Sequence, residues 1–501
     1  MATVCSVTRR YNTRLHTRTK IGSWLSLPTE LRIMILETFA RDKHPGWSTL
    51  ASVCREWQYI IARQNLRKLE LRSSCLESFG RLITTQRGFV RHIWLNIELQ
   101  QYPCQHYQGA DQFSQENGPL IITAIRKIFS ILSKWKPGKG LTLELNAYRP
   151  SDQDRFFKGF YFATDDEGEV SSGAPHPRWH DPRHGWLNSY RVGPPPRSAI
   201  SRLFEQITLN FGQQELPRVE VVTHFIVRRQ LRRRLSYWSF KPILDSLCCL
   251  RHMVYEPWRG WERLWASRAD MEHSLMFQQS LPATVKTLTV FEDFNEKIAE
   301  TLARSERLAW YRCVARYRIA DPGLGAIFAS KSLKLERLSV SFLVDAEDFF
   351  DSCIKEQGTW RQLETLALTV RLFQEGKPHQ EINDLLLKAS EIAVRMPKLR
   401  TMVLWNGTRG NACAFMFQAM EGCAIITWRS TWDLEISRRV EEGWEPLASR
   451  IHSCSLRTRK ERIHGQVASH GDAIHLLDLP CQVVEPASLW QIRREGALTS
   501  L

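Results

Sequence analysis

The sequence lacks a long hydrophobic run, a secretory signal and a paired-cysteine motif. No apolar stretch approaches the roughly 20 residues that a helix needs to span a bilayer, which argues against an integral membrane protein. None of the 12 cysteines belongs to a Cys-x-x-Cys pair, so a structural zinc site is not expected. Without a signal peptide, these cysteines are expected to be reduced thiols of an intracellular protein, in the cytoplasm or nucleus.

Common catalytic motifs are also missing. The chain contains no Gly-x-Ser-x-Gly elbow, no phosphate-binding Gly-x-x-x-x-Gly-Lys-Ser/Thr loop, no dinucleotide Gly-x-Gly-x-x-Gly and no His-Glu-x-x-His. Ser469, His470 and Asp472 have the residue types of a catalytic triad, but neighbouring side chains point in different directions, whereas a triad converges from separate elements. This segment is predicted to be a turn before a strand at 473–479. We therefore expect no enzymatic activity, no metal and no other cofactor.

The sequence does have ample material for a core and an excess of positive charge. Of its 501 residues 43% are hydrophobic, including 18 Trp and 23 Phe, so a sizeable core can form. The 69 Lys and Arg outnumber the 53 Asp and Glu, which gives a net charge of +16. One basic cluster lies in residues 1–22, which contain no acidic residue and are predicted to form a disordered tail.

The second basic cluster has five arginines within seven residues: Arg228, Arg229, Arg232, Arg233 and Arg234. Such a run can serve as a nuclear localisation signal or a phosphate-binding patch. It can also be the solvated face of a helix that follows the apolar run 219–227. We favour the helix face, because no aromatic residues that could stack on bases alternate with the arginines. Nucleic acid is therefore not the expected partner.

Residues 23–69 are predicted to form two short amphipathic helices. Pro28 and Glu30 suit the first turn of a helix, because proline lacks an N–H there and a carboxylate favours the helix dipole. Its apolar face would comprise Leu27, Leu31, Ile35 and Phe39, at every fourth residue. A second helix, capped by Ser48 or Thr49, would carry Leu50, Val53, Cys54, Trp57, Ile60 and Ile61. Two small helices cannot shield so much apolar surface, so a protein partner is expected.

The same residues resemble an F-box, in which Leu-Pro-x-Glu-Leu is followed by Leu-x-x-Val-Cys-Arg-x-Trp. The matching residues are Leu27, Pro28, Glu30, Leu31, Ile35, Leu50, Val53, Cys54, Arg55 and Trp57. F-box proteins are substrate receptors whose F-box holds a Skp-type adaptor, which links them to a cullin scaffold and a ubiquitin-conjugating enzyme. The resemblance implies an adaptor-binding face that consists of Leu27, Pro28, Leu31, Ile35, Leu50, Val53, Cys54 and Trp57.

Residues 70–480 are predicted to form an irregular α/β solenoid similar to leucine-rich repeats. An apolar pattern φ-x-x-φ-x-φ, typical of the strand in such repeats, begins at Val90, Leu250, Val285, Leu335, Leu363 and Leu399. Chance matches to this pattern are common, and the spacing between copies is uneven. Polar lead-ins before four copies and an amphipathic helix at 381–395 favour a curved, parallel sheet with helices between its strands.

Two further segments depart from the repeat pattern. Residues near 163–198 are rich in Gly, Pro and polar side chains and are predicted to be an inserted surface loop. Its His176, His180 and His184 are spaced as on a helix face, but Pro177 and Pro182 exclude a continuous helix, so a metal site is not expected. Residues 481–501 are predicted to be a C-terminal tail.

The region from about 200 to 494 resembles an uncharacterised domain that occurs behind F-boxes in filamentous-fungal proteins. The matching stretches are 227–234, 255–258, 290–295, 335–342, 404–407, 469–475 and 488–493. This resemblance implies a fungal source. It implies no particular chemistry, because no activity is assigned to the family.

Together these features predict the substrate receptor of a Skp–cullin–F-box ubiquitin ligase, with an unidentified client bound by the solenoid. Two alternatives remain open. One is a nucleic-acid or chromatin-associated protein that uses the arginines of 228–234 and the basic tail. The other is a scaffold that binds the adaptor in an assembly without ligase activity.

Overall fold

The computed structural model describes residues 24–42, 47–101, 113–160, 179–193, 195–204, 206–261, 263–296, 298–299, 319–356, 358–420, 422–452 and 456–498. The chain divides into two compact units, Met1–Leu69 and Glu70–Leu501. The boundary falls at the end of the predicted two-helix segment, residues 23–69. The predicted basic tail, residues 1–22, lies outside the described residues.

The first unit contains the two predicted helices, α1 (Thr29–Asp42) and α2 (Arg55–Asn65), with the 3-10 turns η1 (Trp24–Ser26) and η2 (Trp47–Ser52). Helix α1 begins where the sequence predicts it. The carbonyl of Pro28 accepts a hydrogen bond from the Arg32 N–H at 3.1 Å, and Glu30 lies in the first turn. The first predicted helix is therefore confirmed.

The second helix begins later than predicted. A continuous helix from Ser48 or Thr49 is wrong, because residues 47–52 form the tighter turn η2 and the backbone becomes extended at Cys54, with φ −162°. The Ser52 hydroxyl donates to the Thr49 carbonyl at 2.7 Å, and the Val53 N–H donates to the Leu50 carbonyl at 3.2 Å. These local bonds close the turn and separate Leu50 and Val53 from the helical stripe of α2.

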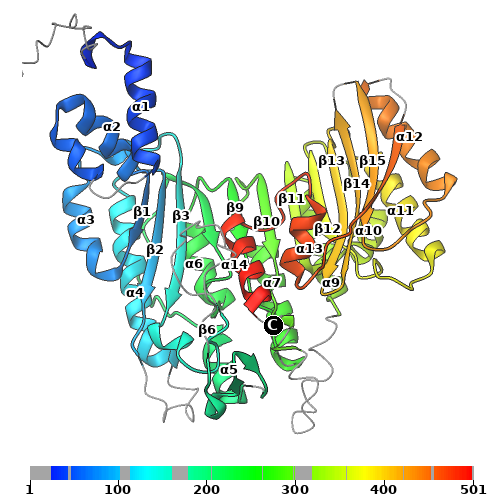
Figure 1. Ribbon diagram of the computed structural model, residues 1–501, viewed down its shortest axis with the longest axis horizontal. Helices are drawn as coiled ribbons and strands as arrows, with labels where there is room; N and C mark the ends of the chain where they lie inside the picture. The colour runs from blue at the N-terminus through cyan, green and yellow to red at the C-terminus, as the bar shows by residue number, and fades with distance from the viewer. Residues whose placement is uncertain are drawn as a thin grey trace, which may run out of the picture. The chain divides into compact units, whose positions relative to one another are not determined.

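The described part of the second unit is built on a large, mostly parallel sheet (Figure 1). Its order is β1-β2-β3-β7-β9-β10-β11-β12-β13-β14-β15-β16. The bounds are β1 Lys68–Leu71, β2 His92–Glu98, β3 Leu141–Tyr148, β7 Val222–Val227, β9 His252–Tyr255, β10 Thr287–Phe291, β11 Arg337–Asp345, β12 Thr365–Thr369, β13 Thr401–Thr408, β14 Asn411–Met420, β15 Cys423–Ser430 and β16 Leu456–Arg462. Neighbouring strands from β2 to β13 are parallel.

All six predicted apolar motifs lie at strands of this sheet, on β2 and on β9 to β13. The central residues of the five motifs from β9 to β13 pair directly with one another, and Ile93 of β2 joins the same buried row through Leu143 and Phe225. The row is Ile93, Leu143, Phe225, Met253, Leu288, Leu338, Leu366 and Met402, each at most 2% exposed. The predicted strands and their parallel arrangement in this part of the chain are confirmed.

Two strands of the same row, β3 and β7, are not among the six predictions. Strand β7 fits the pattern from Val222 onward. In β3, Gly140 stands where the other copies have Val or Leu. Its φ is +83°, and an added Cβ would lie 2.5 Å from the Thr223 hydroxyl oxygen, so a larger residue does not fit there.

Helices cover both faces of the sheet (Figure 1). On one face lie α4 (Phe113–Leu132), α6 (Tyr237–Ser246), α7 (Arg263–Leu275), α9 (Pro322–Ser332), α10 (Ala346–Lys355) and α11 (His379–Ala393), with α3 (Leu76–Leu82) and α12 (Arg438–His452) at the ends. On the other lie α13 (His470–Leu477) and α14 (Pro486–Leu498), whose Ala473, Ile474 and Ile492 share a core with Phe291, Ala367, Val403 and Trp405. Both faces are therefore apolar, as in other parallel sheets.

The sheet differs from the prediction near its end. Strand β14 is antiparallel to β13 and β15, because Gly410 and Gly422, both at positive φ, allow tight hairpin turns. The strand predicted at 473–479 is wrong, since residues 473–477 belong to helix α13, where the Ser469 hydroxyl accepts from the Asp472 N–H. The C-terminal tail predicted at 481–501 is also wrong, because Pro486–Leu498 forms α14 and packs on the sheet.

The predicted insertion is described only in part, since 161–178, including His176, lie outside the described residues. The remainder contains the small hairpin β4 (Trp186–Leu187) and β5 (Tyr190–Arg191). His184 and Lys158 both contact the Asp181 carboxylate, at 2.8 and 2.7 Å. His180 lies 3.2 Å from the Asn188 side chain, so the two described histidines have separate partners. Within the described residues, no helix is long and apolar enough to cross a membrane.

Candidate functional sites

Apolar side chains are exposed on the first unit. We define the apolar ridge as Leu31, Met34, Ile35, Phe39 and Val53, which are 36% to 62% exposed. Of the predicted adaptor-binding residues, Pro28, Leu31, Ile35, Val53 and Cys54 are exposed, and Leu27, Leu50 and Trp57 are half-buried. Within the first unit, the described residues thus leave the ridge uncovered.

The ridge points outward because other side chains of α1 and α2 hold the unit together. Leu36, Ile60 and Ile61 are buried, and the Arg32 guanidinium lies 3.3 Å from the Glu56 carboxylate. The Trp57 ring packs against Trp24, with 5.2 Å between the ring centroids. The internal contacts of the unit therefore use a different set of residues from the ridge.

Exposed apolar residues are concentrated in this unit. Of the 16 large apolar residues that are exposed in the described chain, six lie between Leu31 and Tyr59. Single exposed apolar residues are common on protein surfaces, whereas a group of them indicates a binding surface. The first unit therefore has a candidate docking surface.

The arginine run is neither a helix nor a solvated surface. It lies in the turn between β7 and β8 (Arg234–Leu235), and four of its five side chains are at most 4% exposed. The buried members and their carboxylate partners are Arg228 with Glu144, Arg229 with Asp293 and Glu495, Arg232 with Glu495, and Arg233 with Asp152. The predicted helix face is wrong. The alternative basic patch is not present either, since only Arg234 of the run is partly exposed.

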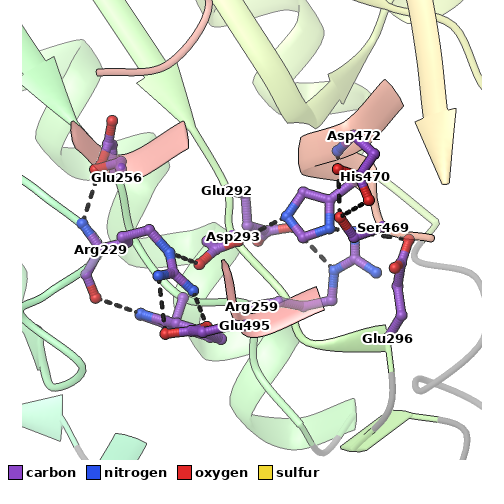
Figure 2. Close-up of polar contacts among 12 residues, drawn as sticks. Arg229, Glu256, Arg259, Glu292, Asp293, Glu296, Ser469, His470, Asp472 and Glu495 are labelled. Atoms are coloured by element: carbon purple, nitrogen blue, oxygen red, sulfur yellow. Dashed lines mark hydrogen bonds and ion pairs between the residues drawn. The ribbon is translucent and has the colours of Figure 1, made fainter. Parts of the chain in front are cut away.

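Arg229 is at the centre of this buried charge cluster (Figure 2). Its guanidinium contacts Asp293, which follows β10, and Glu495 of α14, whose oxygens lie 2.6 and 3.1 Å from the two terminal nitrogens. Its backbone N–H donates to Glu256 at 3.0 Å, and its carbonyl accepts from the Trp258 indole at 2.7 Å. A bidentate pair of this kind fixes both distance and orientation. The cluster therefore joins α14 to the loops that follow β7, β9 and β10.

His470, the first residue of α13, completes the cluster from the other side of Asp293. Its Nε2 lies 3.0 Å from the Asp293 carboxylate, and its Nδ1 lies 3.8 Å from Glu296. Its ring stacks on Phe294, with 4.3 Å between centroids. Figure 2 shows that both ring nitrogens of His470 face carboxylates, while the Ser469 hydroxyl bonds to Asp472. Ser469, His470 and Asp472 therefore do not converge as a catalytic triad.

The pKa values reflect burial and charge pairing. Burial opposes ionisation of Asp293, but Arg229 and His470 outweigh it and lower the pKa of Asp293 to about 2. Burial disfavours charge on His470, but Asp293 and Glu296 raise its pKa to about 9. For Glu256, burial dominates and raises the pKa to about 7, although hydrogen bonds from Ser488 and two backbone N–H groups oppose the shift. At neutral pH, Asp293 and His470 thus form a buried ion pair.

A small cavity lies beside the cluster. It has a volume of about 30 Å³ and is lined in part by Arg229, Phe294, Glu296, His470 and Glu495. The surrounding charged groups already pair with one another. We therefore interpret the cluster as structural: it holds α13 and α14 against the loops that follow the strands.

The His470 charge predicts a specific dependence of stability on pH. The pKa of histidine is about 6.5 when unfolded and about 9 here, so its stabilisation is complete below pH 6.5 and is lost as pH rises through 9. Between pH 6.5 and 9.5, the free energy of unfolding should fall by about 2–3 kcal/mol more in the wild type than in His470→Gln. Urea unfolding at several pH values measures this difference. The exposed His464→Gln is the control; equal slopes for wild type and His470→Gln would contradict the assignment.

Comparison with known families places the C-terminal region in context. Residues 280–485 match a family of unknown function (DUF6546), so the C-terminal region contains a domain of this kind. The matched segment lies inside the 200–494 region that resembles an uncharacterised domain, and it includes Asp293 and His470. No curated protein and no solved structure matches the chain.

Proposed function

We propose that the protein is an F-box substrate receptor, in which the first unit docks a Skp-type adaptor and the second binds a client protein. The single observation that carries the proposal is the exposed apolar ridge at the positions of the F-box motif. Leu31 and Ile35 of that motif are 45% and 36% exposed, and Val53 is 59% exposed. An amphipathic helix that leaves such side chains in water is suited to a groove on a partner.

The energetic argument is that covering this ridge removes large apolar groups from water. Fully burying a Leu, Ile, Val, Phe or Met side chain contributes about 1.5–3 kcal/mol. The helices keep their own core of Leu36, Ile60 and Ile61, so a partner could cover the ridge without rearranging the unit. Such preorganised apolar anchors usually dominate the affinity of an interface.

The second unit supports a role in client binding under this proposal. Its parallel strands with apolar side chains in one row favour the interpretation as an irregular solenoid similar to leucine-rich repeats. The antiparallel strand β14 and the helices α13 and α14 are departures from a regular repeat. We interpret β14 as the end of the regular repeats, and α13 and α14 as a cover on the second face of the sheet.

The two alternatives differ in what supports them. Burial of Arg228, Arg229, Arg232 and Arg233 removes one of the two basic segments on which the nucleic-acid alternative was based. The other segment, the basic tail of residues 1–22, lies outside the described residues. A ligase-independent scaffold would use the same ridge and the same adaptor. It is distinguished by its failure to recruit the cullin scaffold and to promote ubiquitination of a client.

Replacing ridge residues should abolish adaptor binding. Leu31→Asp combined with Ile35→Asp places two charges where the partner must be apolar. With about 2 kcal/mol lost at each of the two anchors, Kd should rise roughly 1000-fold. Calorimetric titration of a purified Skp-type adaptor into each variant measures this change.

The matched control has two aspartates at exposed apolar helix positions elsewhere. Leu82 on α3 and Ile354 on α10 are 78% and 52% exposed, so Leu82→Asp with Ile354→Asp should leave the affinity unchanged. Unfolding curves verify that both variants stay folded. Unaltered adaptor binding by a folded ridge variant, or no binding by the wild type, would refute the receptor proposal.

A further inference from the structure

Strand β16 lies at one edge of the sheet in the described part of the chain. It runs parallel to β15 over seven residues, from Leu456 opposite Ala424 to Arg462 opposite Ser430. Five of the seven residues are exposed, and only Leu456 and Glu461 are partly covered. An edge strand of this length is a template for one more strand.

The backbone orientation shows which groups remain on the outer side. The N–H of Ile463 donates to the Ser430 carbonyl at 2.8 Å, so odd-numbered residues of this strand direct their backbone groups toward β15. In a strand, the N–H and C=O of successive residues alternate between the two edges. The backbone groups of Thr458, Lys460 and Arg462 therefore face the open edge.

The open edge is strongly basic. Arg457, Arg459, Lys460 and Arg462 accompany a single acid, Glu461, whose carboxylate is already engaged by Arg429 at 2.5 Å and by Arg459 at 3.3 Å. Arg462 contacts Asp433, whereas Arg457 and Lys460 form no ion pair with any described residue. Two cationic side chains, one on each face of the strand, are thus available to a ligand.

This charge decides between occupants of the edge. A second copy of the chain would bring its own basic strand against this one, and like charges opposite each other are destabilising. An acidic segment would supply carboxylates to both faces while its backbone continues the sheet. We propose that β16 binds an extended, acidic segment of another protein, about seven residues long, as an additional strand. Only the identification of that protein as a client rests on the proposed receptor function.

A designed peptide tests the proposal directly. The probe is a fluorescein-labelled peptide of sequence Thr-Val-Glu-Glu-Glu-Val-Thr, which places carboxylates on both faces of an extended strand. Fluorescence anisotropy measures its Kd for the full chain without adaptor. Arg457→Glu with Lys460→Glu should weaken binding at least tenfold through charge reversal. Lys460→Pro should also weaken it at least tenfold, because proline removes an outward N–H and is tolerated at a strand edge.

The control reverses two exposed arginines of α12, Arg438→Glu with Arg439→Glu, and so makes the same change in net charge. Its affinity should stay within twofold of the wild type. A peptide with proline replacing the central glutamate should bind at least tenfold more weakly, since it cannot pair along the edge.

Four results would overturn the proposal: no peptide binding by the wild type, equal binding of the proline peptide, equal loss in the α12 control, or tighter binding of a single-stranded oligonucleotide that also depends on Arg457 and Lys460. Failure here leaves adaptor binding by the ridge unaffected. Conversely, the ridge variant Leu31→Asp with Ile35→Asp should bind the peptide normally, so the two proposals fail separately.

Discussion

Replacement of Asp293 by alanine should lower the free energy of unfolding by about 3–5 kcal/mol, because it removes the anion between two buried cations. Asp293 is 0% exposed and contacts both Arg229 and His470. Arg229 would keep Glu495, but His470 would keep only Glu296, at 3.8 Å. The free energy of unfolding of a protein is only about 5–15 kcal/mol. A loss of about 3–5 kcal/mol should therefore leave the variant close to unfolding at 37 °C.

Urea unfolding of the wild type and Asp293→Ala measures this loss. The matched control is Asp433→Ala, because Asp433 also pairs with an arginine, Arg462 at 2.8 Å, but is 94% exposed. An exposed pair contributes about 0–1 kcal/mol, so the control should differ little from the wild type. A loss below about 1 kcal/mol for Asp293→Ala would show that the buried cluster does not stabilise the fold.

Truncation after Glu485 should prevent the second unit from folding to a stable state. It removes α14, and with it Glu495, the carboxylate that holds both Arg229 and Arg232. It also removes Ile492 from the core that covers this face of the sheet. Exposure of apolar surface and loss of the carboxylate partner of two buried arginines both lower the stability of the folded state.

Solubility, limited proteolysis and thermal unfolding measure the effect, with truncation after Leu498 as the control that retains α14. Glu495→Gln separates the two contributions, since it keeps the helix and the apolar contacts and removes only the charge. We expect the wild type to be the most stable, Glu495→Gln to be less stable, and the chain truncated after Glu485 to be the least stable. A truncated chain that unfolds cooperatively at the wild-type temperature would contradict the role assigned to α14.

The six strands that carry the apolar motif could be predicted from the sequence because their determinants are local. Each motif places apolar residues at three fixed positions, and parallel neighbours align these positions into a row. Strand β3 does not match the pattern because Gly140 occupies the position of the first apolar residue. Glycine is needed there for the positive φ and for the close approach of Thr223. Helix α1 could be predicted for the same reason. The residues that favour its start, Pro28 and Glu30, and the apolar residues at every fourth position all lie within one short segment.

The buried charge cluster could not be predicted in this way, because its partners are distant in sequence. Arg233 pairs with Asp152, 81 residues away, and Arg229 pairs with Glu495, 266 residues away. Five arginines in seven residues resemble a solvated surface when their carboxylates are unknown. The signal present in the sequence is that Glu256 and Asp293 come shortly after the apolar motifs that begin at Leu250 and Val285, and both are partners of Arg229.

The long span of the Arg229–Glu495 contact also bears on how the chain acquires its structure. Contacts between residues far apart in sequence require the closure of large loops, which slows folding. On a ribosome, the strands from β7 to β13 emerge before α14 is synthesised. Arg229 therefore lacks its bidentate partner Glu495 until the end of synthesis. During that interval the sheet face later covered by α14 is open to other molecules, and a holding chaperone is the natural protection for such an intermediate.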